Sequence, residues 1–202
     1  MLLEDLERNF IAFLDEAHRL KKLYAPQITL LVGAETEYIT GLDLDRLHSM
    51  LERHGGRIEL LVGSVHHVNT IPIDFDQPTF DRALRSCSSN DDEKDVNSFL
   101  EQYFDSQYTL LTRFQPEVIG HLDLCRLYTP TLEITSFPGA WSKLERNVKY
   151  ACGYGALFEF NSAAFRKGWD CAYPGRDVVN VCMILNEYVQ AAHAMFLSDR
   201  IS

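Results

Sequence analysis

The 202-residue sequence predicts a single α/β domain in which helices cover a sheet of parallel strands. Segments with helical periodicity alternate with short apolar runs along the whole chain. These runs are nearly continuous, which is typical of strands that are buried on both faces in a parallel sheet or barrel. No internal repeat, interdomain linker or low-complexity tract divides the sequence. We therefore expect one domain over residues 1–202.

The predicted helices are recognised by apolar spacing and by the residues that end them. From Leu3 to Leu20, apolar residues recur at spacings of three and four, and Pro26 ends this first helix. The Gly55–Gly56 pair closes the second helix. The predicted helices cover residues 2–24, 43–54, 96–114, 142–154 and 176–194, with a short helix after Pro78.

Apolar runs between the helices predict the strands, and polar stretches predict the loops. The predicted strands cover residues 28–39, 58–66, 117–123, 156–161 and 195–199. Residues 69–78 are expected to form a loop, in which Asp74 and Asp76 cap the turn that follows Pro72. The acidic stretch 86–95 is expected to be a solvated loop.

Composition narrows the classes of function. The formal net charge is -10, from 19 Lys and Arg against 29 Asp and Glu, which argues against a general nucleic-acid binder. It does not exclude an anionic substrate, because bound metal ions can reverse the local sign of a site. Five scattered cysteines without a C-x-x-C motif, an acidic first ten residues and no membrane-length apolar run together predict a cytoplasmic protein.

Potential metal ligands and acid–base groups follow every predicted strand. In parallel β/α folds the carboxyl ends of the strands converge on one face, where active sites form. Imidazole mixed with carboxylate suits Zn, Mn or Fe, and several such ligands on one face predict a site of two or more ions that could hydrolyse a phosphate ester. The residues at these strand ends are Glu35 and Glu37, His66 and His67, His121 and Asp123, Glu159 and Asn161, and Asp199.

Two cations after the predicted strand 156–161 could hold a phosphate group. The stretch "NSAAFRKG" contains Arg166, whose guanidinium can bind two phosphate oxygens, and Lys167, which offers a point charge. Ordinary surface salt bridges are the alternative use for these side chains. From the residues alone, we infer metal-dependent hydrolysis of a phosphomonoester.

Some strand-end residues have more than one interpretation. Glu37 and His67 are expected to support the ligands or to pack, because neighbouring strand residues point to opposite faces. Asp123 could orient a ligand imidazole or cap a loop. For Glu159 and Asn161, a place in the substrate pocket and a strand-end hydrogen-bonding role are equally supported.

Four motifs resemble the histidinol-phosphatases of the PHP (polymerase and histidinol phosphatase) superfamily, most of all the fungal histidine-biosynthesis type. They are "VGAETEYI", "VGSVHHVNTIPIDFD", "VIGHLDLCRL" and "FEFNSAAFRKGWDCAYP", within a resemblance that extends over residues 28–199. The "GSVHHV" stretch followed by "PIDFD" is the most specific of these markers. The resemblance implies a distorted (β/α)7 barrel with two or three metal ions that converts L-histidinol phosphate to L-histidinol and phosphate.

The resemblance also implies roles for individual residues. Glu35 of the G-x-E motif, His66 of G-S-x-H and His121 of G-H-x-D would be metal ligands in the catalytic centre, with Asp199 as a further ligand. Arg166 would contact the phosphate in catalysis. Together with the interpretation of the residues above, this gives Arg166, Lys167, Glu159 and Asn161 as the expected substrate-binding residues.

The sequence departs from the family pattern at both ends. It contains no H-x-H motif, which ends the family's first strand, and of the closing Ser-Asp-x-x-His motif it keeps only Ser198 and Asp199. The barrel is therefore expected to be incomplete at its N-terminal end, and it could also be incomplete at its C-terminal end. A shortened reading frame and a degenerate, non-catalytic paralogue with a binding role both explain this pattern. A PHP phosphoesterase for another small phosphate ester is a further alternative.

Overall fold

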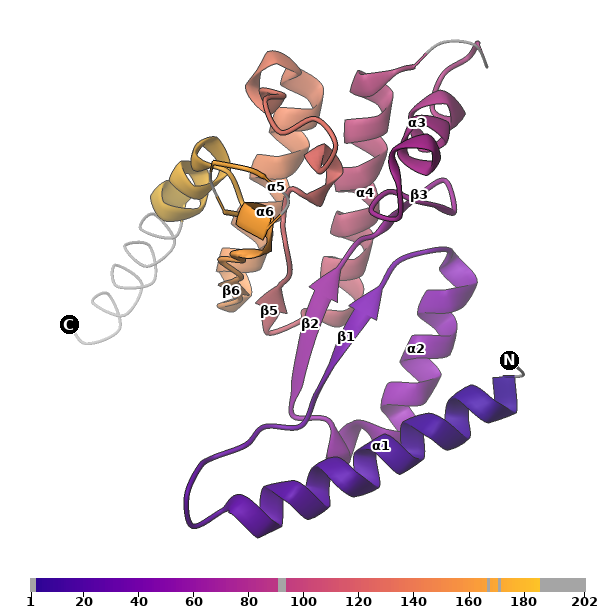
Figure 1. Ribbon diagram of the computed structural model, residues 1–202, viewed down its shortest axis with the longest axis vertical. Coiled ribbons are helices and arrows are strands. Elements are labelled where there is room, and N and C mark those ends of the chain that lie inside the picture. The colour runs from indigo at the N-terminus through magenta and orange to yellow at the C-terminus, as the bar shows by residue number, and fades with distance from the viewer. Residues whose placement is uncertain (1–2, 91–93, 167, 171, 186–202) are drawn as a thin grey trace, which may run out of the picture.

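A computed structural model describes residues 3–90, 94–166, 168–170 and 172–185. The predicted α/β architecture is confirmed: four parallel strands form one sheet in the order β1-β2-β5-β6 (Figure 1). Because the strands are parallel, their carboxyl ends lie along one edge of the sheet. The strands are β1 (Gly33–Glu37), β2 (Leu60–Ser64), β5 (Val118–Ile119) and β6 (Leu157–Phe158).

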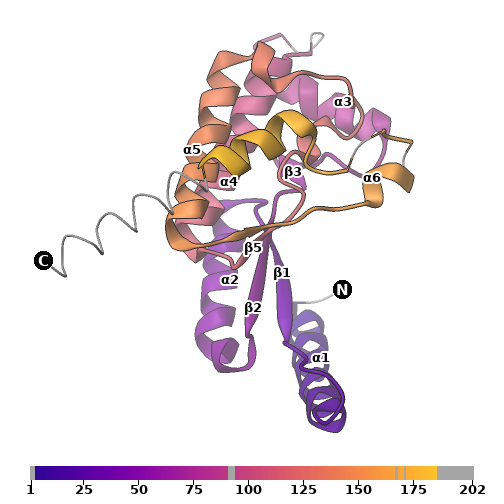
Figure 2. The ribbon, with the colours of Figure 1, turned by 90° about the vertical axis from the view of Figure 1, so that its left-hand side faces the viewer.

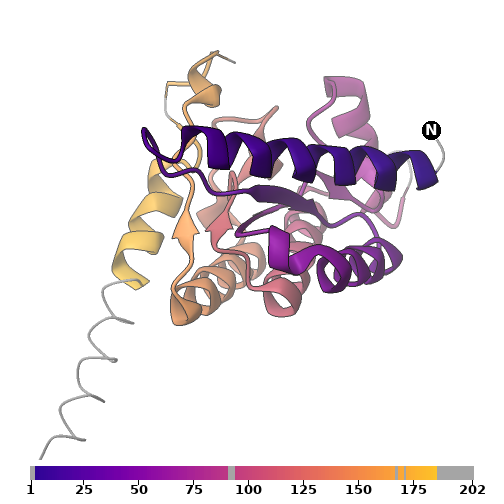
Figure 3. The ribbon, with the colours of Figure 1, turned by 90° about the horizontal axis from the view of Figure 1, so that it is seen from below.

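Helices cover both faces of this sheet. Seen from below, α1 lies on one face, and α2, α4 and α5 lie on the other (Figure 3). Figure 2 shows α1 and α3 at opposite ends of the molecule. The helices are α1 (Leu3–Tyr24), α2 (Gly41–His54), α3 (Gln77–Ser86), α4 (Val96–Phe114), α5 (Pro138–Tyr154) and α6 (Ala163–Arg166), and residues 176–185 are also helical.

The helix α4 has the bounds that the sequence predicts. The side chain of Asp95 accepts a hydrogen bond from the backbone N–H of Ser98 at 2.9 Å, which caps the first turn. The helix ends where Gln115 adopts a left-handed conformation with φ 46°. Its buried face includes Phe99 and Leu110, which are 1% and 0% exposed.

The strands are shorter than predicted, because only part of each predicted segment pairs with a neighbour. The segment 28–39 contributes only Gly33–Glu37 to the sheet, for example, and the remainder of it runs outside the ladder. A short antiparallel hairpin also lies within the predicted loop 69–78 and just before it, with β3 at His67–Val68 and β4 at Ile71–Pro72. Sequence periodicity over two residues is too short to reveal such a hairpin.

The sheet is open within the part of the chain that the structure describes. Strands β1 and β6 are its edges and do not pair with one another there, so a closed barrel is not seen. The predicted final strand 195–199 and the end of the predicted helix 176–194 lie outside the described residues. None of the described helices is long and apolar enough to cross a membrane.

Candidate metal centre

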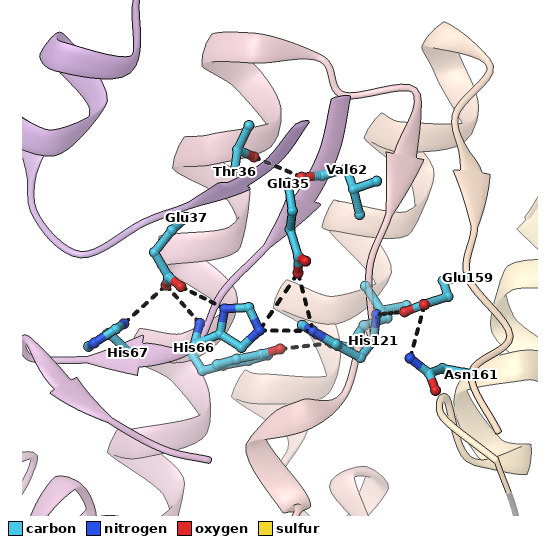
Figure 4. A network of polar contacts seen from close by, with 11 residues as sticks. Glu35, Thr36, Glu37, Val62, His66, His67, His121, Glu159 and Asn161 are labelled. Carbon is cyan, nitrogen blue, oxygen red and sulfur yellow. Dashed lines mark hydrogen bonds and ion pairs between the residues drawn. The ribbon is translucent and has the colours of Figure 1, made fainter. Parts of the chain in front are cut away.

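Three strand ends bring a glutamate and two histidines together (Figure 4). Glu35 lies in β1, His66 follows β2 by two residues, and His121 follows β5 by two residues. One donor atom from each residue lies within 4.8 Å of the other two. The sequence prediction that these three residues converge at the carboxyl edge of the sheet is therefore confirmed.

The geometry of these three donor atoms fits one metal ion. The Nε2 atoms of His66 and His121 lie 2.9 Å apart, and they lie 3.8 and 3.7 Å from Oε1 of Glu35. A point equidistant from three atoms at these separations is about 2.0 Å from each, the length of a Zn–N or Zn–O bond. The side chain of Glu35 is 54% exposed, so water and substrate can reach this point. Two nitrogens and one oxygen are a donor set for Zn, Mn or Fe.

Glu37 fixes the ring of His66. One oxygen of its carboxylate lies 2.6 Å from Nδ1 of His66, and the other accepts the backbone N–H of the same residue at 2.9 Å. Since Nδ1 donates to this carboxylate, the Nε2 lone pair of a neutral His66 is available to a metal. The carboxylate also contacts Nδ1 of His67 at 3.1 Å. The expected supporting role of Glu37 and His67 agrees with these contacts.

The two histidines of this cluster have opposite pKa shifts. Burial lowers the pKa of His66, but the hydrogen bond and charge of Glu37 outweigh burial, and the pKa stands above its ordinary value. Burial lowers the pKa of His121, and the charge of His66 lowers it further. Burial raises the pKa of Glu37, but the hydrogen bonds from His66 bring it below its ordinary value. In the metal-free state, a protonated His66 can thus donate to both Glu37 and the neutral His121.

His121 is held through its backbone. Its N–H donates to Oε2 of Glu159 at 2.8 Å, and Oε1 of Glu159 accepts from the side chain of Asn161 at 2.9 Å. Nδ1 of His121 is buried and has no hydrogen-bond partner among the described residues. The preceding Gly120 leaves no room for a larger residue, because a Cβ there would lie 2.4 Å from Oγ of Ser64. A strand-end hydrogen-bonding role is thus observed for Glu159 and Asn161, and a role in substrate binding stays a prediction.

The remaining predicted site residues make no hydrogen bond or ion pair with this cluster, or they lie outside the described residues. Arg166 ends the short helix α6, is exposed, and makes no ion pair with the part of the chain that the structure describes. Lys167 and Asp199 lie outside that part. Asp76, expected to cap the turn after Pro72, instead caps helix α3, where its side chain accepts the backbone N–H of Thr79 at 2.7 Å.

The structure also contains a buried ion pair that was not predicted from the sequence. The carboxylate of Asp123 accepts from Nη2 of Arg126 at 2.6 Å and from the backbone N–H of Gly175 at 2.8 Å, and Arg126 also contacts Asp177 at 2.7 Å. Asp123 therefore ties loops together and has no contact with a ligand imidazole among the described residues. The only indication of this ion pair in the sequence is the charged Arg126 within the mainly apolar stretch "LDLCRLY".

A parallel α/β sheet with imidazole and carboxylate donors at its carboxyl edge defines the class of α/β metal-binding domains. The chain belongs to the PHP domain family, whose model matches residues 5–163.

Curated relatives are named for one activity. The chain is 42% identical over 174 residues to "Probable histidinol-phosphatase" of Schizosaccharomyces pombe, covering 85% of this chain and 55% of that one. It is 30% identical over 202 residues to histidinol-phosphatase of Saccharomyces cerevisiae, covering 87% and 59%. The chain thus spans a little more than half the length of these relatives.

A solved structure has the same fold. It is described as the "putative histidinol phosphatase" of Listeria monocytogenes and superposes with a TM-score of 0.71, at 19% sequence identity. The match covers 92% of this chain and 69% of the other. The predicted fold class is therefore confirmed independently of sequence identity.

Proposed function

We propose that this chain is the metal-binding part of a phosphomonoesterase that hydrolyses L-histidinol phosphate to L-histidinol and phosphate in histidine biosynthesis. The observation that carries the proposal is the convergence of Glu35, His66 and His121, with donor atoms within 4.8 Å of one another. The names of the curated relatives support the choice of substrate.

The proposed centre uses Glu35, His66 and His121 as ligands for Zn, Mn or Fe. A divalent ion bound there would lower the pKa of a bound water and polarise a phosphoryl oxygen. Glu37 keeps Nε2 of His66 directed at the ion, and Glu159 holds the backbone of His121. In the complete centre we propose two or three ions, with further ligands such as Asp199 outside the described residues.

Charged residues of both signs support the proposed contacts with the phosphate and the ammonium group of the substrate. Arg166 is exposed, and it could bind the phosphate together with Lys167. The carboxylates of Glu35 and Asp74 raise the pKa of His66 by their negative charge, so the centre has an acidic surround that suits the ammonium group of histidinol. Glu159 and Asn161 are the proposed contacts for the remainder of this substrate.

The net charge of -10 favours a small phosphate ester over nucleic acid. The four described cysteines are free thiols, which supports a reducing compartment such as the cytoplasm.

Phosphate release with added Mn or Zn tests the proposal. We expect faster turnover of histidinol phosphate than of p-nitrophenyl phosphate or a 5′-phosphorylated oligonucleotide. Glu35→Gln should lower kcat/KM more than about a hundredfold, beyond the range for losing an outer-shell partner. His48→Ala, at an exposed position on α2, is the control and should retain activity.

The relative turnover of the three compounds separates the proposed substrate from the alternatives. Turnover of all three compounds at similar rates would contradict the proposed substrate but retain the hydrolase. Metal binding without turnover of any of them would favour a non-catalytic binding role.

A further inference from the structure

The backbone carbonyl next to His121 is the end point of a buried polar network. The carbonyl oxygen of Leu122 accepts from the hydroxyl of Tyr103 at 3.4 Å and from Nε2 of Gln107 at 3.3 Å. Both donors come from α4, where Tyr103 is 0% exposed and Gln107 is 2% exposed. The segment that carries His121 is therefore fastened to the helix layer behind the sheet.

A second amide, on α5, fixes the orientation of Gln107. Nδ2 of Asn147 donates to Oε1 of Gln107 at 3.0 Å and to the carbonyl of Phe104 at 2.7 Å. Since Oε1 of Gln107 is used as an acceptor, its Nε2 must face Leu122. Asn147 is held in turn, because its Oδ1 accepts from Nη2 of Arg146 at 3.0 Å.

The polar groups of this network are buried among apolar side chains. They lie in the apolar interior with residues such as Leu100, Leu144 and Val148. Burying amides and a hydroxyl among such side chains costs free energy unless each makes hydrogen bonds, and apolar residues could fill the same space without that requirement. We therefore expect these polar groups of α4 and α5 to have a role beyond packing the two helices together.

His121 needs this support more than His66 does. The ring of His66 has Glu37 as a partner, whereas Nδ1 of His121 is buried with no partner among the described residues. The ring position of His121 consequently depends on its backbone. That backbone is held on one side by Glu159 and on the other by the network at Leu122.

We propose that Gln107 and Tyr103, with Asn147 behind them, are positioning residues for the metal centre. By holding the Leu122 carbonyl, they keep Nε2 of His121 directed at the same point as the donors of Glu35 and His66. This inference rests on the metal centre proposed above.

Metal affinity of the full chain, measured by competition with a chromophoric chelator for Zn, tests the inference. Tyr103→Phe should weaken binding about twofold, and Gln107→Met about tenfold, at the low end of the range for outer-shell partners. The double variant should weaken it further. Gln107→Met leaves Asn147 bonded to Phe104, which limits the damage to folding.

A destabilised control separates positioning from folding. Val148→Ala removes buried methyl groups beside Asn147 without removing a hydrogen bond, so it should lower the unfolding midpoint yet keep Zn affinity within about twofold. Combining Gln107→Met with Glu37→Gln should multiply the two losses, because each acts on a different histidine.

Each outcome decides between the hypotheses. If Gln107→Met and Val148→Ala weaken Zn binding equally, the network is merely structural and the inference is wrong. Unchanged Zn affinity in the Tyr103→Phe/Gln107→Met double variant would overturn it as well. Failure of the unmodified chain to bind Zn would instead refute the metal centre itself.

Discussion

The two histidines of the candidate centre lie side by side, but the protein secures them in different ways. Glu37 contacts both the ring and the backbone N–H of His66, at 2.6 and 2.9 Å (Figure 4). For His121 the contacts are to the backbone, through Glu159 at 2.8 Å and through the neighbouring Leu122 carbonyl. One histidine is thus oriented through its ring and the other through the backbone that carries it.

This difference has an electrostatic consequence. A carboxylate on the ring raises the pKa of His66, whereas burial and the charge of His66 lower that of His121. A metal therefore competes with a proton for His66 up to a higher pH than it does for His121. The charge of Glu37 therefore sets the proton affinity of His66, whereas contacts to the backbone set the position of His121.

Removal of a ligand should have the largest effect. His66→Ala and His121→Ala should each weaken Zn binding more than about a hundredfold, beyond the range for outer-shell partners. The two variants should differ in titration, which sharpens the comparison. In the metal-free His66→Ala chain the pKa of His121 should rise, because the charge that lowers it is gone. NMR titration measures this shift. An unchanged pKa of His121 would show that the two rings are not coupled.

Loss of the carboxylate behind His66 should have a smaller effect. Glu37→Gln should weaken Zn binding by about ten- to a hundredfold and lower the pKa of His66, since the hydrogen bond and charge that raise it are weakened. Glu59→Gln is the matched control, because that carboxylate also accepts a backbone N–H, from Val32 at 2.9 Å, but at the opposite end of the sheet. Equal losses in the two variants would contradict a specific role for Glu37.

The pKa shifts of His66 and His121 predict that the stability of the metal-free chain depends on pH. A folded-state pKa of His66 above its ordinary value means that its stabilisation is fully present below the ordinary imidazole pKa. This stabilisation is lost as the pH rises through the raised pKa. The lowered pKa of His121 acts in a separate window, below the ordinary value. Unfolding midpoints should therefore fall over the upper window, and Glu37→Gln should flatten that fall.

The sequence could predict that the three residues of the candidate centre converge, because their positions depend on local pattern and on one rule of topology. Glu35, His66 and His121 follow apolar runs, and parallel strands bring their carboxyl ends together. Helix α4 could be predicted for a similar reason, since its periodicity and its cap at Asp95 are local.

Long-range partners could not be predicted from a single sequence. Arg126 and Asp177 are 51 positions apart, and Gln107 meets Asn147 from another helix. Nothing in the residues near Gln107 indicates that its amide reaches the Leu122 carbonyl. The extent of each strand is also a tertiary property: Ile28 belongs to the same apolar run as β1, but only Gly33–Glu37 of that run pair with β2.

Glu159 should give the smallest effect and can settle which of its two interpretations holds. Glu159→Gln keeps an oxygen for the N–H of His121 but loses the acceptor for Asn161. The loss of one such hydrogen bond, about 1 kcal/mol, should weaken Zn binding about fivefold at most. A role restricted to positioning would lower kcat for histidinol phosphate and p-nitrophenyl phosphate alike. A contact with the histidinol ammonium group would in addition raise KM for histidinol phosphate alone. Glu117→Gln is the control, because this carboxylate accepts the N–H of Leu61 at 2.7 Å away from the metal ligands, and neither parameter should change.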